Sequence, residues 1–441
     1  MSTQSKSIRI ALLIVLLLTS VGALVTVSNA AEVITISQLA GPWEIALTGN
    51  TGCGASSMLF AGNLDASGVA TGSLVFSSVQ CGSSSGAQTF TITSLNAHGS
   101  GTANLSCGTN CGWDFNIQVA ANEQTFSLVD LNRTNGLAGT AVTETGSGMT
   151  LDQMAGPWQI ALLGNTGCGV SSMVFTGTMN ANGTATGTLT GSSTQCLPSS
   201  STQTFTITGL NENGFGTASL SCGAGCGWNF QIQVSADRQV FNLVDFVDGD
   251  SNVLAGTAIS QVGSTITVDQ LAGPWDIALV GNTGCGRSSM QFAGTMNFTG
   301  TATGTLTGDS VQCGFSSGTQ TLTIESLNAD GSGTATLSCG SGCGWTFDIQ
   351  VAPHAGMFSL VDVVNAGNQL AGTAVAEPGF VTVTVTVPDL LGESLQQATA
   401  DVKALGLHLR AFGSGYVASQ RPAPGAGVPP GSTVTVFLLN Q

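Results

Sequence analysis

Short runs of residues that alternate between apolar and polar fill the chain from about residue 33 to about residue 378. Alternation with a period of two is typical of a β-strand that buries one of its faces. No stretch there has a convincing helical period, so the pattern predicts all-β structure. In the first 115 residues of this region, turn signals rich in Gly, Asn, Asp and Ser separate eight runs, near 43–48, 58–64, 69–77, 88–95, 101–107, 111–120, 125–131 and 137–143.

The apolar positions of these runs define the face that we expect to be buried. Thr, Ser, Asn and Gln dominate the alternate positions, for example Asp114, Asn116 and Gln118, so the other face is expected to be wet. Connections this short join neighbouring antiparallel strands, and closing the sheet removes both exposed edges. The sequence therefore predicts an eight-stranded antiparallel up-and-down β-barrel. The predicted inward residues are Trp43, Ile45, Leu47, Met58, Phe60, Leu64, Phe90, Ile92, Trp113, Phe115, Ile117, Val119, Phe126 and Leu128.

Cysteine spacing indicates that this module is present three times. Each copy opens with Ala-Gly-Pro-Trp and has four cysteines, separated by 28, 26 and 4 residues. We therefore expect three tandem β-barrel repeats, at residues 33–147, 148–263 and 264–378. The twelve cysteines are Cys53, Cys81, Cys107 and Cys111; Cys168, Cys196, Cys222 and Cys226; and Cys285, Cys313, Cys339 and Cys343.

Residues 1–30 have the features of a secretory signal peptide. Lys6 and Arg9 precede an apolar stretch from Ile10 to Val27, and small residues follow where a signal peptidase cuts. We predict cleavage after Ala30. The alternative is an uncleaved anchor, because 18 apolar residues lie at the lower limit for spanning a bilayer. In both cases the repeats would face an oxidising compartment.

The strand order places all four cysteines of a repeat at the same end of its barrel. In an oxidising compartment, paired cysteines favour disulfides over metal ligands. The expected pairs are Cys53 with Cys81 and Cys107 with Cys111, with equivalent pairs in the other repeats. Four cysteines permit three pairings, and one tetrathiolate zinc per repeat is the alternative.

The charge balance excludes one class of partner. Charged residues make up only 7% of the chain, and the formal net charge of -16 arises mainly because Lys and Arg are scarce. Binding to a phosphate backbone needs a basic stripe or patch that displaces counterions. The chain has none, so we expect no nucleic-acid partner.

One acidic position recurs in every repeat, as the Asp of Leu-Val-Asp. Parity places it near the cysteine end, together with the Asn of Asn-Thr-Gly-Cys-Gly and the Gln that precedes the second cysteine. A polar rim that binds a sugar or Ca²⁺ is one hypothesis. The alternative is that these side chains satisfy backbone groups around the end of the barrel. The candidate rim residues are Asn50, Gln80, Asp130, Asn165, Gln195, Asp245, Asn282, Gln312 and Asp362.

Motifs that would indicate catalysis were not found. The three histidines, His98, His354 and His408, occupy unrelated positions, and no Ser-His-Asp order or phosphate-binding loop is present. A glycoside hydrolase needs two facing carboxylates, whereas each repeat has one recurring Asp. We therefore expect no catalytic residues, no metal, no cofactor and no enzymatic activity.

The Gly-Pro-Trp at the start of the first strand of each repeat, such as Gly41-Pro42-Trp43, resembles the Gly-x-Trp signature of lipocalins and related calycin barrels. As a family, these barrels bind small apolar molecules. An eight-stranded barrel is wide enough to be filled by side chains or to hold one small ligand. The many large apolar residues predict a filled interior, and a ligand cavity is the alternative.

The segment from about residue 381 to residue 441 differs in kind from the repeats. Apolar residues recur at helical spacing between Leu395 and Leu405, with Ser394 as a candidate N-cap and Gly406 at the end. Two strand-like runs follow, near 407–412 and 432–438. We place a small α+β domain at residues 380–441.

The motifs of this segment closely resemble a PASTA domain. They are the opening Val-Pro-Asp-Leu-Leu-Gly, the helical pattern that ends in Leu-Gly-Leu, and the closing Gln-x-Pro-x-Pro-Gly with Gly-Ser-x-Val. The resemblance implies a bacterial protein outside the membrane, with peptidoglycan fragments or β-lactams as ligands.

Together these features predict a secreted or surface-displayed, non-enzymatic bacterial protein. Its disulfide-stapled barrels would act as a stalk or as adhesive and binding modules, and the C-terminal domain would associate with peptidoglycan. The alternative is an array of lipocalin-like barrels that bind small apolar ligands or glycans. Membrane contact is expected only through an uncleaved N-terminal segment.

Overall fold

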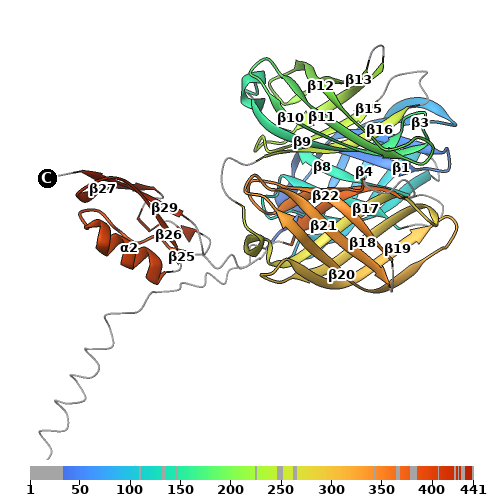
Figure 1. Ribbon diagram of the computed structural model, residues 1–441. Helices are drawn as coiled ribbons and strands as arrows, with labels where there is room; N and C mark the ends of the chain where they lie inside the picture. Colours follow the sequence, from blue (N-terminus) through green and yellow to red (C-terminus); the bar gives the residue numbers. More distant parts are fainter. Residues whose placement is uncertain are drawn as a thin grey trace, which may run out of the picture. The chain divides into compact units, whose positions relative to one another are not determined.

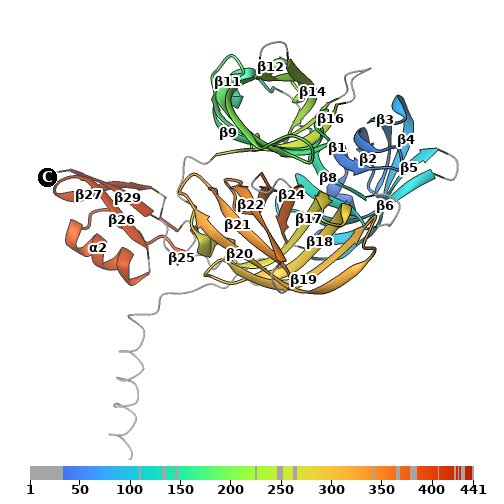
Figure 2. The ribbon, with the colours of Figure 1, turned by 45° about the vertical axis from the view of Figure 1, so that its right-hand side comes forward.

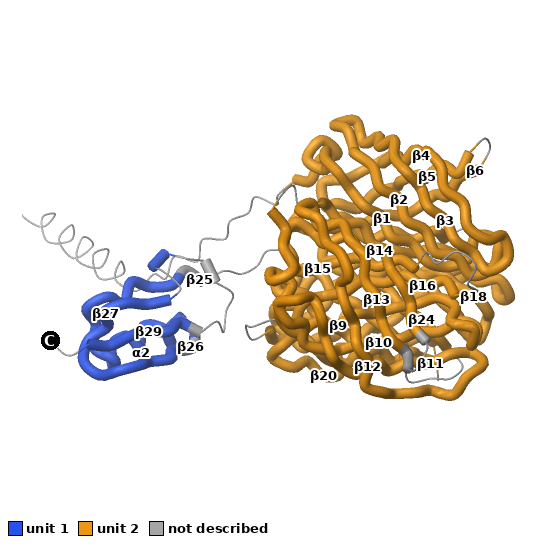
Figure 3. Tube along the Cα trace, turned by 90° about the horizontal axis from the view of Figure 1, so that it is seen from above, with its two compact units in different colours: residues 1–30, 381–441 blue, residues 31–380 orange. Residues whose placement is uncertain are grey.

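The chain divides into two compact units (Figure 3). We name residues 31–380 the barrel unit and residues 381–441 the C-terminal unit. The predicted signal peptide and Gly406 lie outside the described residues, among which no helix is both long enough and apolar enough to span a bilayer. The computed structural model describes residues 33–108, 111–131, 136–144, 148–223, 226–245, 252–261, 266–340, 343–363, 368–377, 385–405, 407–421, 424–425, 427–428 and 433–439.

The barrel unit contains three closed barrels of eight antiparallel strands, each strand paired with the next along the chain (Figure 1). The predicted up-and-down order is therefore confirmed. Barrel one consists of β1 (Gly41–Asn50), β2 (Ala55–Leu64), β3 (Val69–Ser78), β4 (Gly82–Leu95), β5 (Ser100–Gly108), β6 (Cys111–Val119), β7 (Thr125–Asp130) and β8 (Gly136–Thr143). Barrel two consists of β9 (Gly156–Asn165), β10 (Val170–Met179), β11 (Thr184–Ser193), β12 (Ser199–Leu210), β13 (Phe215–Gly223), β14 (Cys226–Val234), β15 (Val240–Asp245) and β16 (Val253–Ser260). Barrel three consists of β17 (Gly273–Thr283), β18 (Gly286–Met296), β19 (Thr301–Ser310), β20 (Ser316–Leu327), β21 (Ser332–Gly340), β22 (Cys343–Val351), β23 (Met357–Val361) and β24 (Gln369–Ala376).

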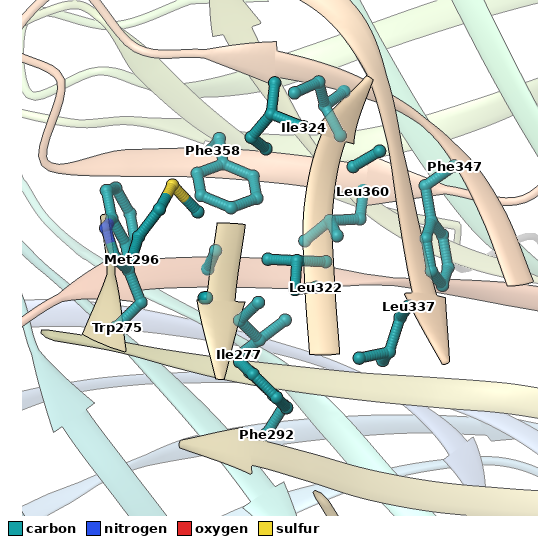
Figure 4. Packing of buried hydrophobic residues seen from close by; sticks show 14 of the residues in the cluster. Trp275, Ile277, Phe292, Met296, Leu322, Ile324, Leu337, Phe347, Phe358 and Leu360 are labelled. Carbon is teal, nitrogen blue, oxygen red and sulfur yellow. The ribbon is translucent and has the colours of Figure 1, made fainter. Parts of the chain in front are cut away.

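Side chains fill the interior of each barrel. In barrel one the buried cluster contains every inward residue that parity predicted, and barrels two and three have equivalent clusters. Figure 4 shows Trp275, Phe292 and Phe358 of barrel three pointing toward the interior. The rings of Trp43 and Phe126 lie 4.8 Å apart between centroids. Fully burying a large apolar side chain contributes about 1.5–3 kcal/mol, so these residues form the core that holds each barrel together.

A single 3₁₀ turn precedes the first strand of each barrel: η1 (Ile36–Leu39), η2 (Leu151–Met154) and η3 (Val268–Leu271). Four residues are too few to show a helical period, so the sequence did not predict these turns. The indole N–H of Trp43 donates a hydrogen bond to the carbonyl of Leu39 at 2.7 Å. Both other barrels repeat this bond. Because a buried indole N–H needs a partner, this bond gives the Trp of the Gly-Pro-Trp stretch a structural role in each barrel.

Disulfides join neighbouring turns at the end of each barrel where its first strand finishes. In barrel one they connect the turn after β1 to the turn after β3, and span the turn between β5 and β6. The side chains of Cys222 and Cys226 lie outside the described set. Among the described residues no cysteine is free, and the bonds are Cys53–Cys81, Cys107–Cys111, Cys168–Cys196, Cys285–Cys313 and Cys339–Cys343.

The three barrels pack against one another in a closed ring (Figure 2). Strands β1 and β2 of barrel one contact β15 and β16 of barrel two, and we name this contact seam 1–2. Strands β9 and β10 contact β23 and β24 of barrel three, which is seam 2–3. Strands β17 and β18 contact β7 and β8, which is seam 3–1 and closes the ring on barrel one.

The seams correct the prediction that the outer face of every barrel is wet. In seam 1–2, Ala46 and Leu59 pack on Val244 and Ala255 of barrel two. Gln118, expected to be wet, is 1% exposed. The outward positions of the seam strands carry small apolar residues, which gain from burial only when a second barrel covers them. The outer faces of β3 to β5, which lie outside the seams, keep exposed Thr and Ser.

The C-terminal unit has one helix, α2 (Leu395–Ala404), and a three-stranded sheet in the order β26 (His408–Gly413), β29 (Thr433–Leu439), β27 (Tyr416–Arg421). Strands β25 (Val385–Thr386) and β28 (Gly427–Val428) form a second, small sheet. The predicted helix is present, and the hydroxyl of Ser394 accepts a hydrogen bond from the backbone N–H of Gln397 at 3.3 Å. Strand β27 was not predicted, because a register shift between Val417 and Ser419 interrupts its alternation.

Candidate functional site

The structure divides the candidate rim residues of barrel one between the seams and an exposed turn. Asn50 is 7% exposed and accepts a hydrogen bond from the guanidinium of Arg287 in barrel three at 2.7 Å. Asp130 is 1% exposed, and its backbone carbonyl accepts from the hydroxyl of Ser289 at 2.6 Å. Gln80 is exposed in the turn after β3. Two of the three residues therefore lie in contacts between barrels.

The Asp and Gln residues divide in the same way in the other two barrels. Asp245 and Asp362 are buried, and their backbone carbonyls accept hydrogen bonds from Ser57 and Ser172 of the preceding barrel. Gln195 and Gln312 are exposed, whereas Asn165 and Asn282 are half-buried. Ligand binding by these residues stays a prediction.

A groove of about 400 Å³ opens on the outer wall of barrel one beside Asp130. It forms where β6 and β7 separate, since their pairing begins only at Asn116 and Val129. Five of its eight lining residues are polar, and two of these five, Asp114 and Asp130, are acidic. The lining residues are Thr93, Thr102, Ala103, Asp114, Phe115, Asn116, Asp130 and Leu131.

The C-terminal unit has a second candidate site, on the face of its sheet opposite the core. Alternate residues of the sheet pack with Ala398 and Val402 of α2 in a buried cluster. The other set of alternate residues points away from that cluster and is exposed. We name the following residues the aromatic face: Arg410, Phe412, Tyr416, Arg421, Phe437 and Leu439.

The strand register fixes the geometry of the aromatic face. Phe412 pairs with Phe437 across parallel strands, and their rings stack with centroids 5.6 Å apart and planes at 17°. The guanidinium carbon of Arg410 lies 4.9 Å from the centroid of the Phe412 ring. Cation–π contact at this distance holds both side chains in place while their outer faces stay in water.

Exposure of this kind is unusual for large apolar residues. Phe412 is 44% exposed, Phe437 42%, Tyr416 47% and Leu439 66%. A cluster of exposed apolar residues bordered by polar groups is typical of an interaction site. The flat rings can stack on the C–H face of a sugar, and the two arginines can bind carboxylate or hydroxyl groups beside it. The sequence carried a signal for this face in β29, because Phe437 and Leu439 alternate with the buried Val436 and Leu438.

Within the part of the chain that the structure describes, no three His, Cys, Asp or Glu side chains converge as a metal site.

Comparison with known proteins identifies the C-terminal unit. Residues 385–439 match the PASTA domain family. No curated protein matches the chain. The C-terminal unit is thus a PASTA domain, as its motifs indicated. This domain and the disulfides point to an extracytoplasmic, cell-wall-associated protein.

Three solved structures illustrate the similarity to known folds. Penicillin-binding protein 2X from Streptococcus thermophilus is 11% identical, with 27% of this chain and 22% of that chain covered and a TM-score of 0.13. The isotype 1 transferrin-binding protein B from serogroup B Neisseria meningitidis is 9% identical, with 76% of each chain covered and a TM-score of 0.25. Kievitone hydratase from Nectria haematococca is 9% identical, with 79% and 94% covered and a TM-score of 0.20. The chain thus spans about a fifth of penicillin-binding protein 2X, and scores this low carry no functional inference.

Proposed function

Taking the C-terminal unit as a PASTA domain, we propose that the protein is a secreted or surface-displayed, non-enzymatic bacterial protein that associates with peptidoglycan through this domain. The match over residues 385–439 carries the proposal. The aromatic face supports it, because it offers stacked rings and two arginines to a polymer of sugars and carboxylate-bearing peptides. The C-terminal unit has three Lys or Arg and three Asp or Glu, so its net charge does not repel such a polymer.

The barrel unit would serve as an adhesive or binding head. Its disulfides brace the turns at one end of each barrel, and the seams join the three barrels into one body. A closed ring supports a compact head better than an extended stalk. The barrel unit has three Lys or Arg and 21 Asp or Glu. Its net charge of −18 favours neutral or cationic partners.

Co-sedimentation with purified peptidoglycan tests the wall association. We expect the full chain to sediment with the polymer and a chain that ends at residue 379 to remain in the supernatant. The truncation removes a separate compact unit, so the Trp fluorescence of the barrel unit should be unchanged and serves as the control for folding. Equal sedimentation of both chains would contradict the proposal.

A glycan site on barrel one is the second candidate function, and the 400 Å³ groove beside Asp130 favours it. Its lining of threonine hydroxyls, an amide and carboxylates suits sugar hydroxyls better than apolar molecules, for which the filled interior leaves little space. Native mass spectrometry with soluble muropeptides and neutral oligosaccharides would test it. We expect adducts that Asp114→Asn weakens, and no adduct with any of these probes would exclude this site.

A further inference from the structure

The residue that follows the first-strand Trp differs among the three barrels. It is Glu44 in barrel one, Gln159 in barrel two and Asp276 in barrel three. In each case it points outward from the barrel into a seam, at 1%, 6% and 6% exposure respectively. A buried, ionised carboxylate is costly unless it is paired. Seams 1–2 and 3–1 thus contain a buried carboxyl group at the position where seam 2–3 has a neutral amide.

A second carboxylate accompanies each of these two acids. Glu144 follows β8, and its backbone N–H donates to the carbonyl of Pro42, which brings it beside Glu44. Glu377 makes the equivalent bond to Pro274 beside Asp276. In barrel two the corresponding residue is Gln261, which bonds to Pro157. Barrels one and three thus have a pair of carboxylates where barrel two has a pair of amides.

The surroundings of Glu44 offer no compensating charge. Among the described residues, no group donates a hydrogen bond to either carboxylate oxygen of Glu44. Strands β2, β8, β14 and β16 place no Lys, Arg or His near it. Two sets of charged groups remain on the elements packed against β1. Barrel two contributes Asp245 at the far end of β15 and Asp237 and Arg238 in the turn before β15. Barrel three contributes Asp276 on β17 and Arg287 on β18, and the guanidinium of Arg287 binds Asn50 at the other end of β1.

Asp276 has more support. Its carboxylate accepts a hydrogen bond from Gln291 at 2.6 Å, and Gln291 in turn accepts one from Asn116 of barrel one across seam 3–1 at 2.7 Å. The other charged groups on the elements packed against Asp276 lie on β18, β6, β7 and the turn before β7, and they are Arg287, Asp114, Asp130 and Glu123.

We propose that the carboxylate pairs Glu44–Glu144 and Asp276–Glu377 each hold a proton in the closed ring, so that seams 1–2 and 3–1 are tightest in mildly acidic surroundings and weaken as the pH rises. Two acids side by side, one of them buried in the seam, cannot both ionise without mutual repulsion and without loss of hydration around the buried one. Seam 2–3, with Gln159 and Gln261, lacks this pair. The titratable groups of seam 2–3 are the half-buried Asp348, the buried Asp362, and Asp237 with His354.

The pKa directions agree with this geometry. Burial raises the pKa of Glu44 well above its usual range, and the charge of Glu144 adds to the effect. Burial raises the pKa of Asp276 to about 7, opposed by the hydrogen bond from Gln291 and assisted by Glu377. A carboxyl group with a raised pKa in the fold contributes its full stability below the pKa of the unfolded chain and loses it as the pH rises through the folded value. For Asp276 this window runs from about pH 4 to about pH 7.

Urea unfolding of the full chain at pH 5.5 and pH 8.5 tests the proposal, with Trp fluorescence as the probe. All six tryptophans lie in the barrel unit, so the signal does not report on the C-terminal unit. We expect the wild-type midpoint to be lower at pH 8.5. Glu44→Gln with Asp276→Asn should remove more than half of that shift, and Gln159→Glu should enlarge it. His354 and Asp348 are present in every variant, so their titration cancels in the comparison.

The milder pair Glu144→Gln with Glu377→Gln covers the case in which a buried substitution prevents folding, because both residues are half-buried. This variant should also reduce the shift of the midpoint. A shift that stays at its wild-type size in both double variants would overturn the proposal.

Discussion

The hydroxyl of Ser57 in barrel one donates a hydrogen bond to the backbone carbonyl of Asp245 in barrel two, at 3.1 Å. Ser172 makes the equivalent bond to Asp362, and Ser289 makes it to Asp130. Each bond crosses one seam, so the three together run from barrel one to two, from two to three and from three back to one. The ring is therefore built from one contact used three times.

Removing one of these hydroxyls should weaken one seam. Ser57→Ala leaves the buried carbonyl of Asp245 without this donor, at an expected cost of about 1–3 kcal/mol in the free energy of unfolding. Urea unfolding followed by Trp fluorescence measures it. Ser73→Ala, at an exposed outward position of β3, is the matched control and should change the free energy by less than about 0.5 kcal/mol. Equal effects of the two substitutions would show that the seam bond contributes nothing.

The two disulfides of a barrel should differ in their contribution to stability. In the chain-entropy treatment, a crosslink across 28 residues contributes about 3–4 kcal/mol and one across 4 residues about 2 kcal/mol. We expect Cys53→Ala with Cys81→Ala to lower the free energy of unfolding more than Cys107→Ala with Cys111→Ala does. Chemical unfolding without reductant gives both values. The reverse order would rule out loop closure as the main source of stabilisation.

His354 should give a pH dependence opposite in sign to that of the carboxylate pairs. Its imidazole lies 3.9 Å from the carboxylate of Asp237 across seam 2–3 and accepts a hydrogen bond at Nδ1 from the backbone of Gly356. Burial lowers the pKa of His354, partly offset by Asp237. Stability from this group is therefore present above pH 6.5 and lost as the pH falls through the lowered value.

The variant His354→Asn carries the residue that barrel one has at the equivalent position, Asn122. Asn is polar, as His is, but it does not titrate. Its unfolding midpoint should fall less than that of the wild type between pH 6.5 and pH 5. An unchanged fall would show that His354 does not titrate with folding. This window overlaps that of Asp276, so the contribution of His354 is the difference between the wild type and His354→Asn at each pH.

The barrel fold could be predicted because its determinants are local. Alternation with a period of two sets which residues face inward, and the short turns favour pairing of each strand with the next one along the chain. The 3₁₀ turns and β27 escaped prediction because a four-residue turn and a strand with a register shift carry no steady period. The predicted architecture does not depend on these elements.

The ring of barrels was not predicted, although β7 and β8 carried a signal for it. Strand β7 is buried along its whole length, and Leu128 and Val129 present apolar side chains to both of its faces. Apolar residues on both faces indicate a strand covered on both sides, and the second cover here is another barrel. The rim hypothesis treated Asp130 as a side chain at an open end, but its position is set by the seam, which depends on residues distant in sequence.

Binding of the full chain to purified peptidoglycan, compared among point variants of the aromatic face, tests the central claim most directly. Phe412→Ala with Phe437→Ala removes the stacked rings without touching the buried cluster of the C-terminal unit. Leu395→Ala is the control, because Leu395 is equally exposed, at 42%, but lies on α2. The account predicts at least a tenfold weaker binding for the double variant and wild-type binding for the control. Equal binding by all three proteins would contradict it.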